Sequence, residues 1–331
     1  MIYADARGDE VVELDKSVLD DAEKITLALR ALYQRCGYTR YRMGKFEEYD
    51  LYARNKDFLL SDNIITFTDT NGKLMALKPD VTLSVIKNHR DEPDTLRKFC
   101  YNESVYRVSR GSGAFRELMQ VGVECVGSVD VRCVGENLRL AAESLALCAE
   151  RFVLEVSHLD ILRRFLYDVT DDAVIRGELL KCVGEKNAHS ISAICRSHAL
   201  SWNKAEALRA LVETYGAPAE VLPRLDALCA GRGLDAELQY LRDALSVVEE
   251  AGLGDKARVD FSTVSNMNYY NGILFKGFIE GIPDSVLSGG QYDKLMRKMG
   301  KRSKAVGFAV YLDRLERLSE TDNRGVIFRD A

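Results

Sequence analysis

Apolar residues at helical spacing give the first strong pattern of the chain, over positions 16–36. Such residues recur three and four positions apart, which places them on one face of a helix, and Gly37 follows as a stop signal. The apolar positions of this stripe are Ile25, Ala28, Leu29, Leu32, Tyr33 and Cys36. The pattern predicts an amphipathic helix that covers a core.

Runs rich in β-branched and aromatic residues follow this helix and predict strands. Asn71-Gly72 lies between two such runs, and this dipeptide accepts the positive φ values of a tight turn. Ala- and Leu-rich residues further on have a helical period. We therefore predict a hairpin over 64–77, strands over 98–108 and 115–127, a helix over 136–150 and a strand over 152–158.

Almost every segment from about 160 to 252 has a helical period, and strand-like runs resume at 258. We expect a turn at Gly289-Gly290, a last strand over 307–312 and a last helix over 313–318. Hairpins without regular β–α–β alternation favour the α+β class over a doubly wound sheet. The predicted organisation is a discontinuous core domain of residues 1–165 and 253–331, interrupted by a helical insertion domain of residues 166–252.

Composition places the chain among globular proteins. Apolar residues make up 47% and charged residues 29% of its 331 residues, and the net charge of −5 does not favour a general nucleic-acid binder. With no 18-residue apolar run and no secretion signal at the start, we expect a cytoplasmic protein without a membrane span. None of the eight cysteines forms a C-x-x-C pair, so no metal site is expected.

Two strand segments carry candidate chemistry. Arg107 and Arg116 bracket a glycine-containing loop and could grip a phosphate or carboxylate, or could simply be surface arginines of a hairpin. Gln120 and Glu124 lie four apart on one predicted strand, so both point to the same sheet face. That face is either exposed or the floor of a polar pocket.

Two further segments have alternative interpretations. Asp80 and Thr82 stand where a strand runs into a helix, so either can cap the helix, and Asp80 can instead point into a cleft. Tyr269 and Tyr270 precede a strand, where paired tyrosines commonly divide between core and surface. The residues alone thus suggest an α+β protein with a cleft for an anion and an ammonium group.

Taken in order, these segments resemble the catalytic core of class II aminoacyl-tRNA synthetases, and within the class the histidyl branch. The resemblance covers nearly the whole chain, including the helical insertion. It implies an antiparallel sheet flanked by helices. The matching segments are CGYTRYRMGKFEEYDLY, ALKPDVT, VYRVSRGSGAFRELMQVGVECVG, VSNMNYYNGILFKGF and SGGQYDKL with AVGFAVYLDRLERL.

Several positions depart from the synthetase pattern. Gly44 replaces the proline of the first class motif, and Ser109 replaces a glutamate of the second. In the histidyl signature, Ser265 and Asn268 replace an arginine and an aspartate. The arginine assists catalysis in the family, and the chain ends 17 residues after Arg314, so we expect neither aminoacylation nor an anticodon-binding domain.

This pattern is similar to that of the non-catalytic family members that serve as regulatory subunits of ATP phosphoribosyltransferase. The resemblance implies activation of a short-form catalytic subunit, feedback by L-histidine in histidine biosynthesis, and no cofactor. It also implies a homodimer, built on segment 36–52, and makes tRNA an unlikely partner. The alternatives are a synthetase-like or amino-acid-adenylating enzyme and a scaffold with an empty pocket.

The family's site residues carry over by matching position. Histidine binding is expected from Asp80, Thr82, Gln120, Glu124, Tyr269 and Tyr270. Vestigial nucleotide contacts are expected from Arg107, Arg116 and Arg314.

Overall fold

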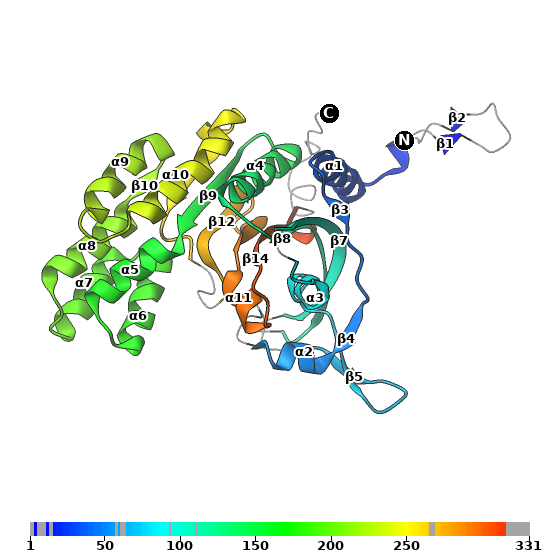
Figure 1. Ribbon diagram of the computed structural model, residues 1–331, viewed down its shortest axis with the longest axis horizontal. Coiled ribbons are helices and arrows are strands. Elements are labelled where there is room, and N and C mark those ends of the chain that lie inside the picture. The colour runs from blue at the N-terminus through cyan, green and yellow to red at the C-terminus, as the bar shows by residue number, and fades with distance from the viewer. Residues whose placement is uncertain are drawn as a thin grey trace.

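A nine-stranded sheet forms the centre of the molecule (Figure 1). The computed structural model describes residues 3–4, 11–12, 16–56, 59, 64–92, 94–109, 112–264 and 269–315. Neighbouring strands are antiparallel except β11 with β9 and β3 with β7. In spatial order the strands are β10 (Tyr215–Gly216), β11 (Ala257–Asp260), β9 (Phe152–His158), β12 (Asn271–Ile279), β13 (Leu287–Gln291), β14 (Lys304–Tyr311), β8 (Phe115–Gly127), β7 (Leu96–Val108) and β3 (Thr39–Arg40).

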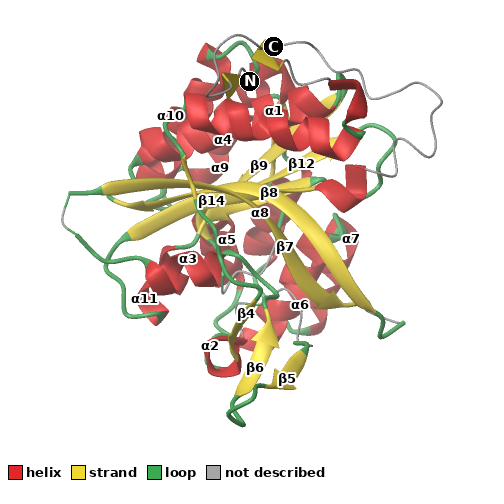
Figure 2. Cartoon of the chain, turned by 90° about the vertical axis from the view of Figure 1, so that its right-hand side faces the viewer, coloured by secondary structure: helices red, strands yellow, loops and turns green. Residues whose placement is uncertain are grey.

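Helices cover both faces of this sheet (Figure 2). On one face lie α1 (Asp21–Arg35) and α4 (Val131–Cys148), and on the other lie α3 (Thr82–Asn88) and α11 (Asp293–Lys298). A capping box begins α1, in which Asp20 accepts from the Glu23 amide and Glu23 accepts from the Asp20 amide. Buried apolar residues of α1 and α4 form the larger core with the sheet, and α3 and α11 contribute to a second core on the opposite face.

A small sheet extends the face that carries α3. Its strands are β4 (Phe46–Glu48), β6 (Leu74–Leu77) and β5 (Thr66–Thr68), and the short helix α2 (Tyr49–Ala53) follows β4. Near the start of the chain, β1 (Tyr3–Ala4) pairs with β2 (Val11–Val12), and a 3₁₀ turn spans Lys16–Val18.

A block of helices lies at the β10 end of the sheet (Figure 1). Gly135 of α4 allows α10 to approach closely, because a Cβ there would come within 2.5 Å of the Val247 Cγ2 and 3.1 Å of the Ala244 carbonyl oxygen. The helices are α5 (Leu159–Val169), α6 (Ala173–Gly184), α7 (Ala188–Ser197), α8 (Trp202–Glu213), α9 (Pro218–Cys229) and α10 (Asp235–Glu250). The division into a core domain and an insertion domain at residues 166 and 252 stays a prediction.

The α+β class and the synthetase-like antiparallel sheet are confirmed. The predicted hairpin is the β5–β6 pair, and Gly72 adopts the positive φ of 78° that its turn requires. The helix predicted over 136–150 begins earlier, at Val131, where Asp130 accepts from the Cys133 amide as its cap. Ser265 and Asn268 lie outside the described residues, and the last predicted helix is described only as far as residue 315.

The turn expected at Gly289-Gly290 was wrong, because both glycines lie inside strand β13. Gly289 is the cross-strand partner of Phe308 on the neighbouring strand β14, and a Cβ on Gly289 would come within 2.3 Å of the Phe308 Cβ. A Cβ on Gly290 would come within 2.7 Å of the Ile273 carbonyl oxygen. These glycines therefore provide space between close strands and do not reverse the chain.

None of the helices in the described part of the chain is long and apolar enough to span a lipid bilayer.

Candidate functional site

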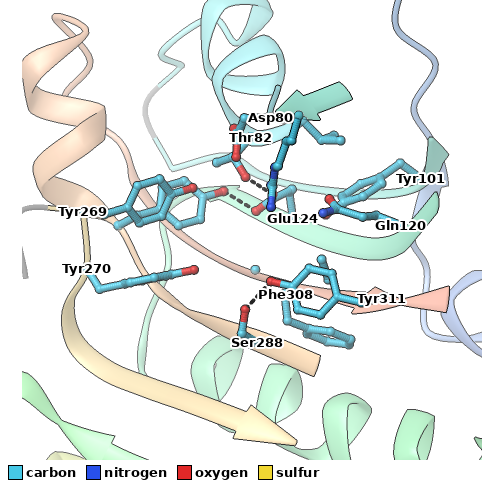
Figure 3. A pocket seen from close by; sticks show the side chains of 15 residues that line it. Asp80, Thr82, Tyr101, Gln120, Glu124, Tyr269, Tyr270, Ser288, Phe308 and Tyr311 are labelled. Atoms are coloured by element: carbon cyan, nitrogen blue, oxygen red, sulfur yellow. Dashed lines mark hydrogen bonds between the residues drawn. The ribbon is translucent and has the colours of Figure 1, made fainter. Parts of the chain in front are cut away.

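One pocket brings together all six residues predicted to bind histidine (Figure 3). It lies between the middle of β8 and β14, the start of α3 and the segment before β12, and its roughly 490 Å³ of empty space is partly open to solvent. The predicted residues that line it are Asp80, Thr82, Gln120, Glu124, Tyr269 and Tyr270.

Glu124 lies at the floor of the pocket, on β8, and is 2% exposed. Its carboxylate accepts hydrogen bonds from the Thr82 hydroxyl at 2.6 Å and from the Tyr292 hydroxyl. Gly307 of the neighbouring strand β14 provides the space, because a Cβ there would lie 1.9 Å from the Glu124 Oε2. Burial, helped by the nearby charge of Asp80, raises the pKa of Glu124 to about 8 despite the hydrogen bonds from Thr82 and Tyr292.

Asp80 faces the same space from the start of α3. Its carboxylate accepts from the Leu83 amide at 2.9 Å, so it caps the helix and lines the pocket at once. Burial raises the pKa of Asp80, while the Leu83 amide and the charge of Arg107 act in the opposite direction. Both carboxyl groups are unfavourable to ionise in the empty pocket, because they are removed from water. A bound cation would pair with the two carboxylates and offset this cost, so the pocket favours a cationic ligand.

Aromatic hydroxyl groups form the other walls. Tyr269 and Tyr270 have ring centroids 4.5 Å apart, and Tyr269 also packs against Tyr292 at 5.9 Å. On the opposite side, Tyr311 and Ser288 share a hydrogen bond of 2.5 Å (Figure 3). The pocket thus combines acidic groups, neutral donors and flat apolar rings, a set that suits a small amino acid with an aromatic side chain.

Sequence reasoning missed four hydroxyl-bearing residues of the pocket: Tyr101, Ser288, Tyr292 and Tyr311. Alternation along β8 and β14 could have identified one of them, because Tyr311 is the cross-strand partner of Gln120. Tyr101 lies on β7, which β8 separates from β14, and nothing in its local sequence indicates that it lines the pocket.

The three arginines expected as vestigial nucleotide contacts are not gathered together. Arg107 lines the pocket, where its Nε donates to the Pro79 carbonyl at 3.1 Å. Arg116, its cross-strand neighbour, is exposed. Arg314 donates to the Ser285 carbonyl and lies over the ring of Tyr311, 4.5 Å from its centroid, but it does not line the pocket.

Among the residues that the structure describes, no three His, Cys, Asp or Glu side chains are grouped as they would be around a metal ion. The cysteines carry no disulfide, and seven of the eight are buried.

Comparison with known proteins identifies the family. The family model of histidyl-tRNA synthetase matches residues 11–315. The chain belongs to the histidyl-tRNA synthetase family.

Relatives that align with this chain over most of their length are named regulatory subunits of ATP phosphoribosyltransferase and not histidyl-tRNA synthetases. The ATP phosphoribosyltransferase regulatory subunit of Clostridium kluyveri is 28% identical over 302 residues, 89% of this chain and 77% of the relative. The protein of the same name from Caldanaerobacter subterraneus is 28% identical over 304 residues, 89% of this chain and 78% of the relative. The resemblance to regulatory subunits of ATP phosphoribosyltransferase is thereby confirmed.

Solved structures share the fold. An ATP phosphoribosyltransferase regulatory subunit/histidyl-tRNA synthetase from Bacillus halodurans superposes with a TM-score of 0.77 at 23% identity, over 94% of this chain and 84% of the other. A chain of the ATP phosphoribosyl transferase (HisG:HisZ) complex from Thermotoga maritima gives 0.70 at 18% identity, over 88% and 97%.

Proposed function

We propose that the chain is a regulatory subunit of ATP phosphoribosyltransferase that activates a separate catalytic subunit and passes it a histidine signal. The names of the relatives in Clostridium and Caldanaerobacter support the regulatory role. The observation that carries the sensing role is the pair of carboxyl groups of Glu124, which is buried, and Asp80, which is half-buried, inside an aromatic pocket.

Histidine fits this pocket in one orientation. Its ammonium group meets Asp80, Thr82 and Glu124, because the ammonium is a cation with three donors and they offer acceptors. Its imidazole lies along Tyr269 and Tyr270, whose rings are parts of one wall. Gln120, 4% exposed, supplies an amide that donates to the carboxylate or accepts from the ammonium.

An assay of the catalytic subunit tests this function. A short-form ATP phosphoribosyltransferase is measured alone, mixed with this chain, and mixed across a histidine titration. We expect activation on mixing and inhibition by histidine. No activation on mixing contradicts the regulatory role, and activation that histidine leaves unchanged contradicts the sensing role.

Glu124→Gln is the variant that separates the two parts. A glutamine keeps the size of the side chain and an acceptor for Thr82, but it removes the charge that the ammonium needs. Losing a charge-assisted hydrogen bond costs about 1.5–3 kcal/mol, or about a 10- to 100-fold loss of histidine affinity. The variant should still activate the catalytic subunit and should respond to histidine only at correspondingly higher concentrations.

Synthetase-type chemistry is the second candidate, because Arg107 reaches the pocket. Against it stand the positions of Arg116, which is exposed, and Arg314, which bonds to Ser285 outside the pocket wall. We propose that the chain does not itself charge tRNA. Histidine-dependent exchange of pyrophosphate into ATP by the pure chain would contradict this.

A further inference from the structure

Strand β12 begins with a bulge, directly after the two pocket tyrosines. Its pairing with β13 shifts register between Asn271 and Leu274, so Gly272 and Ile273 have no cross-strand partner on β13. Gly272 has a φ of 57°, a backbone conformation that residues other than glycine rarely adopt. A bulge changes the direction of its strand and of the side chains beside it. The path of the chain through this bulge therefore sets how the two tyrosines enter the pocket.

Two side chains that do not line the pocket hold the backbone of the bulge. The Oε1 of Gln291, on β13, accepts from the Ile273 amide at 2.9 Å. The Oδ2 of Asp160 accepts from the Gly272 amide at 3.0 Å. Gln291 is 5% exposed, and a Cβ on Gly272 would lie 2.3 Å from its Oε1, so only glycine fits at this position. The two amides that β13 does not pair are thus satisfied by side chains.

Both side chains connect the bulge to the block of helices. Asp160 is the second residue of α5 and also accepts from Arg163 of the same helix. The Nε2 of Gln291 donates to the hydroxyl group of Tyr240, on α10, at 3.1 Å, which leaves the oxygen end of the amide facing the bulge. The Tyr240 ring packs edge-on against His158, with ring centroids 6.2 Å apart. Helices α5 and α10 therefore act on the bulge from outside the pocket.

The bulge is close to the tyrosine wall in space as well as in sequence. A Cβ on Gly290 would come within 2.9 Å of the Tyr270 Cδ1, so this ring packs on the backbone of β13 beside Gln291. Figure 3 shows the Tyr270 ring extending into the pocket. Asn271, the next residue, donates to the Asp293 carboxylate at 3.2 Å. A displaced bulge would therefore shift Tyr270 over Gly290 and change the shape of the pocket.

We propose that Gln291 and Asp160 are positioning residues of the pocket, because they fix the bulge and with it the tyrosine wall. The proposal rests on the proposed binding of histidine, and it assigns part of the histidine affinity to groups that never touch the ligand. Removing either acceptor leaves a buried amide without a partner, and the bulge can satisfy this amide only by changing its path. Substitution at these two positions should therefore weaken histidine binding through the geometry of the wall.

Calorimetric titration with L-histidine compares Gln291→Met and Asp160→Ala with the native chain. Methionine has the length of glutamine without its polar atoms, and we expect histidine binding about tenfold weaker in each variant, the scale of one lost hydrogen bond. Asp160→Asn keeps an acceptor for the Gly272 amide and should bind histidine nearly as the native chain does. Gln239→Met is the matched control, because Gln239 is exposed on α10 and its amide donates to Asp243 of the same helix.

Hydrogen exchange of the ligand-free proteins, measured by mass spectrometry, separates this proposal from the binding of histidine. Peptides that cover residues 269–276 should exchange faster in Gln291→Met and Asp160→Ala, whereas peptides of α1 should exchange as in the native chain. Gln239→Met should match the native chain in both regions. If the native chain binds no histidine, the sensing function fails, and the exchange of residues 269–276 alone decides whether the two side chains hold the wall.

Three results would overturn the proposal. The first is native histidine affinity in both Gln291→Met and Asp160→Ala. The second is exchange of residues 269–276 that stays unchanged in these variants, or that rises equally in α1, since a general loss of stability would then explain it. The third is an Asp160→Asn variant that binds histidine as weakly as Asp160→Ala, because the acceptor for the Gly272 amide would then not be what matters.

Discussion

At the residue scale, the chemistry of the proposed histidine pocket depends on how Glu124 is buried. Its carboxylate has two hydroxyl donors, from Thr82 and Tyr292, yet burial outweighs them and raises its pKa to about 8. Near neutral pH the empty pocket therefore holds this group mainly in its neutral form. A cation that enters has to displace a proton, so binding of the ammonium and ionisation of Glu124 are linked.

The same shift predicts how the stability of the ligand-free chain depends on pH. The folded state holds the Glu124 proton up to about pH 8, whereas the unfolded chain releases it near pH 4.5, so the folded state binds more protons between these values. Stability contributed by this group is fully present below pH 4.5 and is lost as pH rises through 8. Between pH 6 and pH 8 we expect a loss of about 2 kcal/mol in the free energy of unfolding.

Urea unfolding at the two pH values measures this loss. Glu124→Gln is the control, because glutamine does not titrate, and the difference between the two proteins isolates the contribution of Glu124 from that of other groups such as Asp80. Parallel pH dependence of the native chain and the variant would contradict the prediction.

The pocket residues show what sequence can and cannot predict at this scale. Alternation along one strand correctly placed Gln120 and Glu124 on one face, because the period of two is a property of the backbone. It could not decide between an exposed face and a pocket floor, since that depends on what α3 and β14 bring opposite. Tyr292 was missed for the same reason: it follows β13 and reaches Glu124 only because β13 pairs with β14 and β14 with β8.

At the element scale, close approach between strands determines where glycine is needed. Gly307 faces Glu124 across the β8–β14 pair, and a Cβ there would also lie 2.5 Å from the Val123 carbonyl oxygen. Gly289 and Gly290 were misinterpreted as a turn because a glycine pair has the same signature in both settings. Only the packing of β12, β13 and β14 distinguishes the two.

Gly307→Ala should therefore damage both the fold and the site. A methyl group cannot fit without displacing the Glu124 carboxylate or separating β8 from β14, and overpacking of this kind typically costs about 1–3 kcal/mol. Gly177→Ala is the matched control. Gly177 lies in the middle of α6 with nothing within 4 Å of its Cβ position, so that change should stabilise the protein by about 0.5–1 kcal/mol.

Chemical denaturation of both variants, with and without histidine, measures these effects. We expect Gly307→Ala to lose stability and histidine binding together and Gly177→Ala to keep binding unchanged. Native histidine affinity in Gly307→Ala would show that the strands relax without disturbing Glu124, contrary to the prediction.

At the scale of the whole molecule, the exposed aromatic side chains of the small sheet bear on self-association. Phe46 is 55% exposed and packs edge-on against Phe67 with ring centroids 5.2 Å apart, and Leu74 of the same sheet is 47% exposed. Clustered exposed apolar groups mark contact surfaces. Phe46 belongs to segment 36–52, where the resemblance to the synthetase family leads us to expect the contact of a homodimer.

We predict a homodimer that Phe46→Ser weakens. Sedimentation velocity over a range of micromolar concentrations measures the dissociation constant, and Phe115→Ser is the control, because Phe115 is 72% exposed on a different element. A native chain that sediments as a monomer throughout this range would contradict the homodimer. Equal effects of the two substitutions would contradict the assignment of the surface.

Regulation requires that histidine distinguish two states of an assembly, because a ligand shifts an equilibrium only through its different affinity for the two states. If histidine weakens the binding of the catalytic subunit by some factor, the catalytic subunit must weaken the binding of histidine by the same factor. Couplings of this kind are typically about 5- to 150-fold. The expected result is therefore a pair of equal ratios: histidine affinity with and without saturating catalytic subunit, and subunit affinity with and without saturating histidine.

Calorimetry gives the first ratio and sedimentation the second. Glu124→Gln, assayed at histidine concentrations that saturate only the native chain, should still assemble, and its subunit affinity should not change with histidine. If both ratios are one while histidine still inhibits the complex, the signal does not act through assembly, and the inhibition arises within the complex or at the catalytic subunit itself.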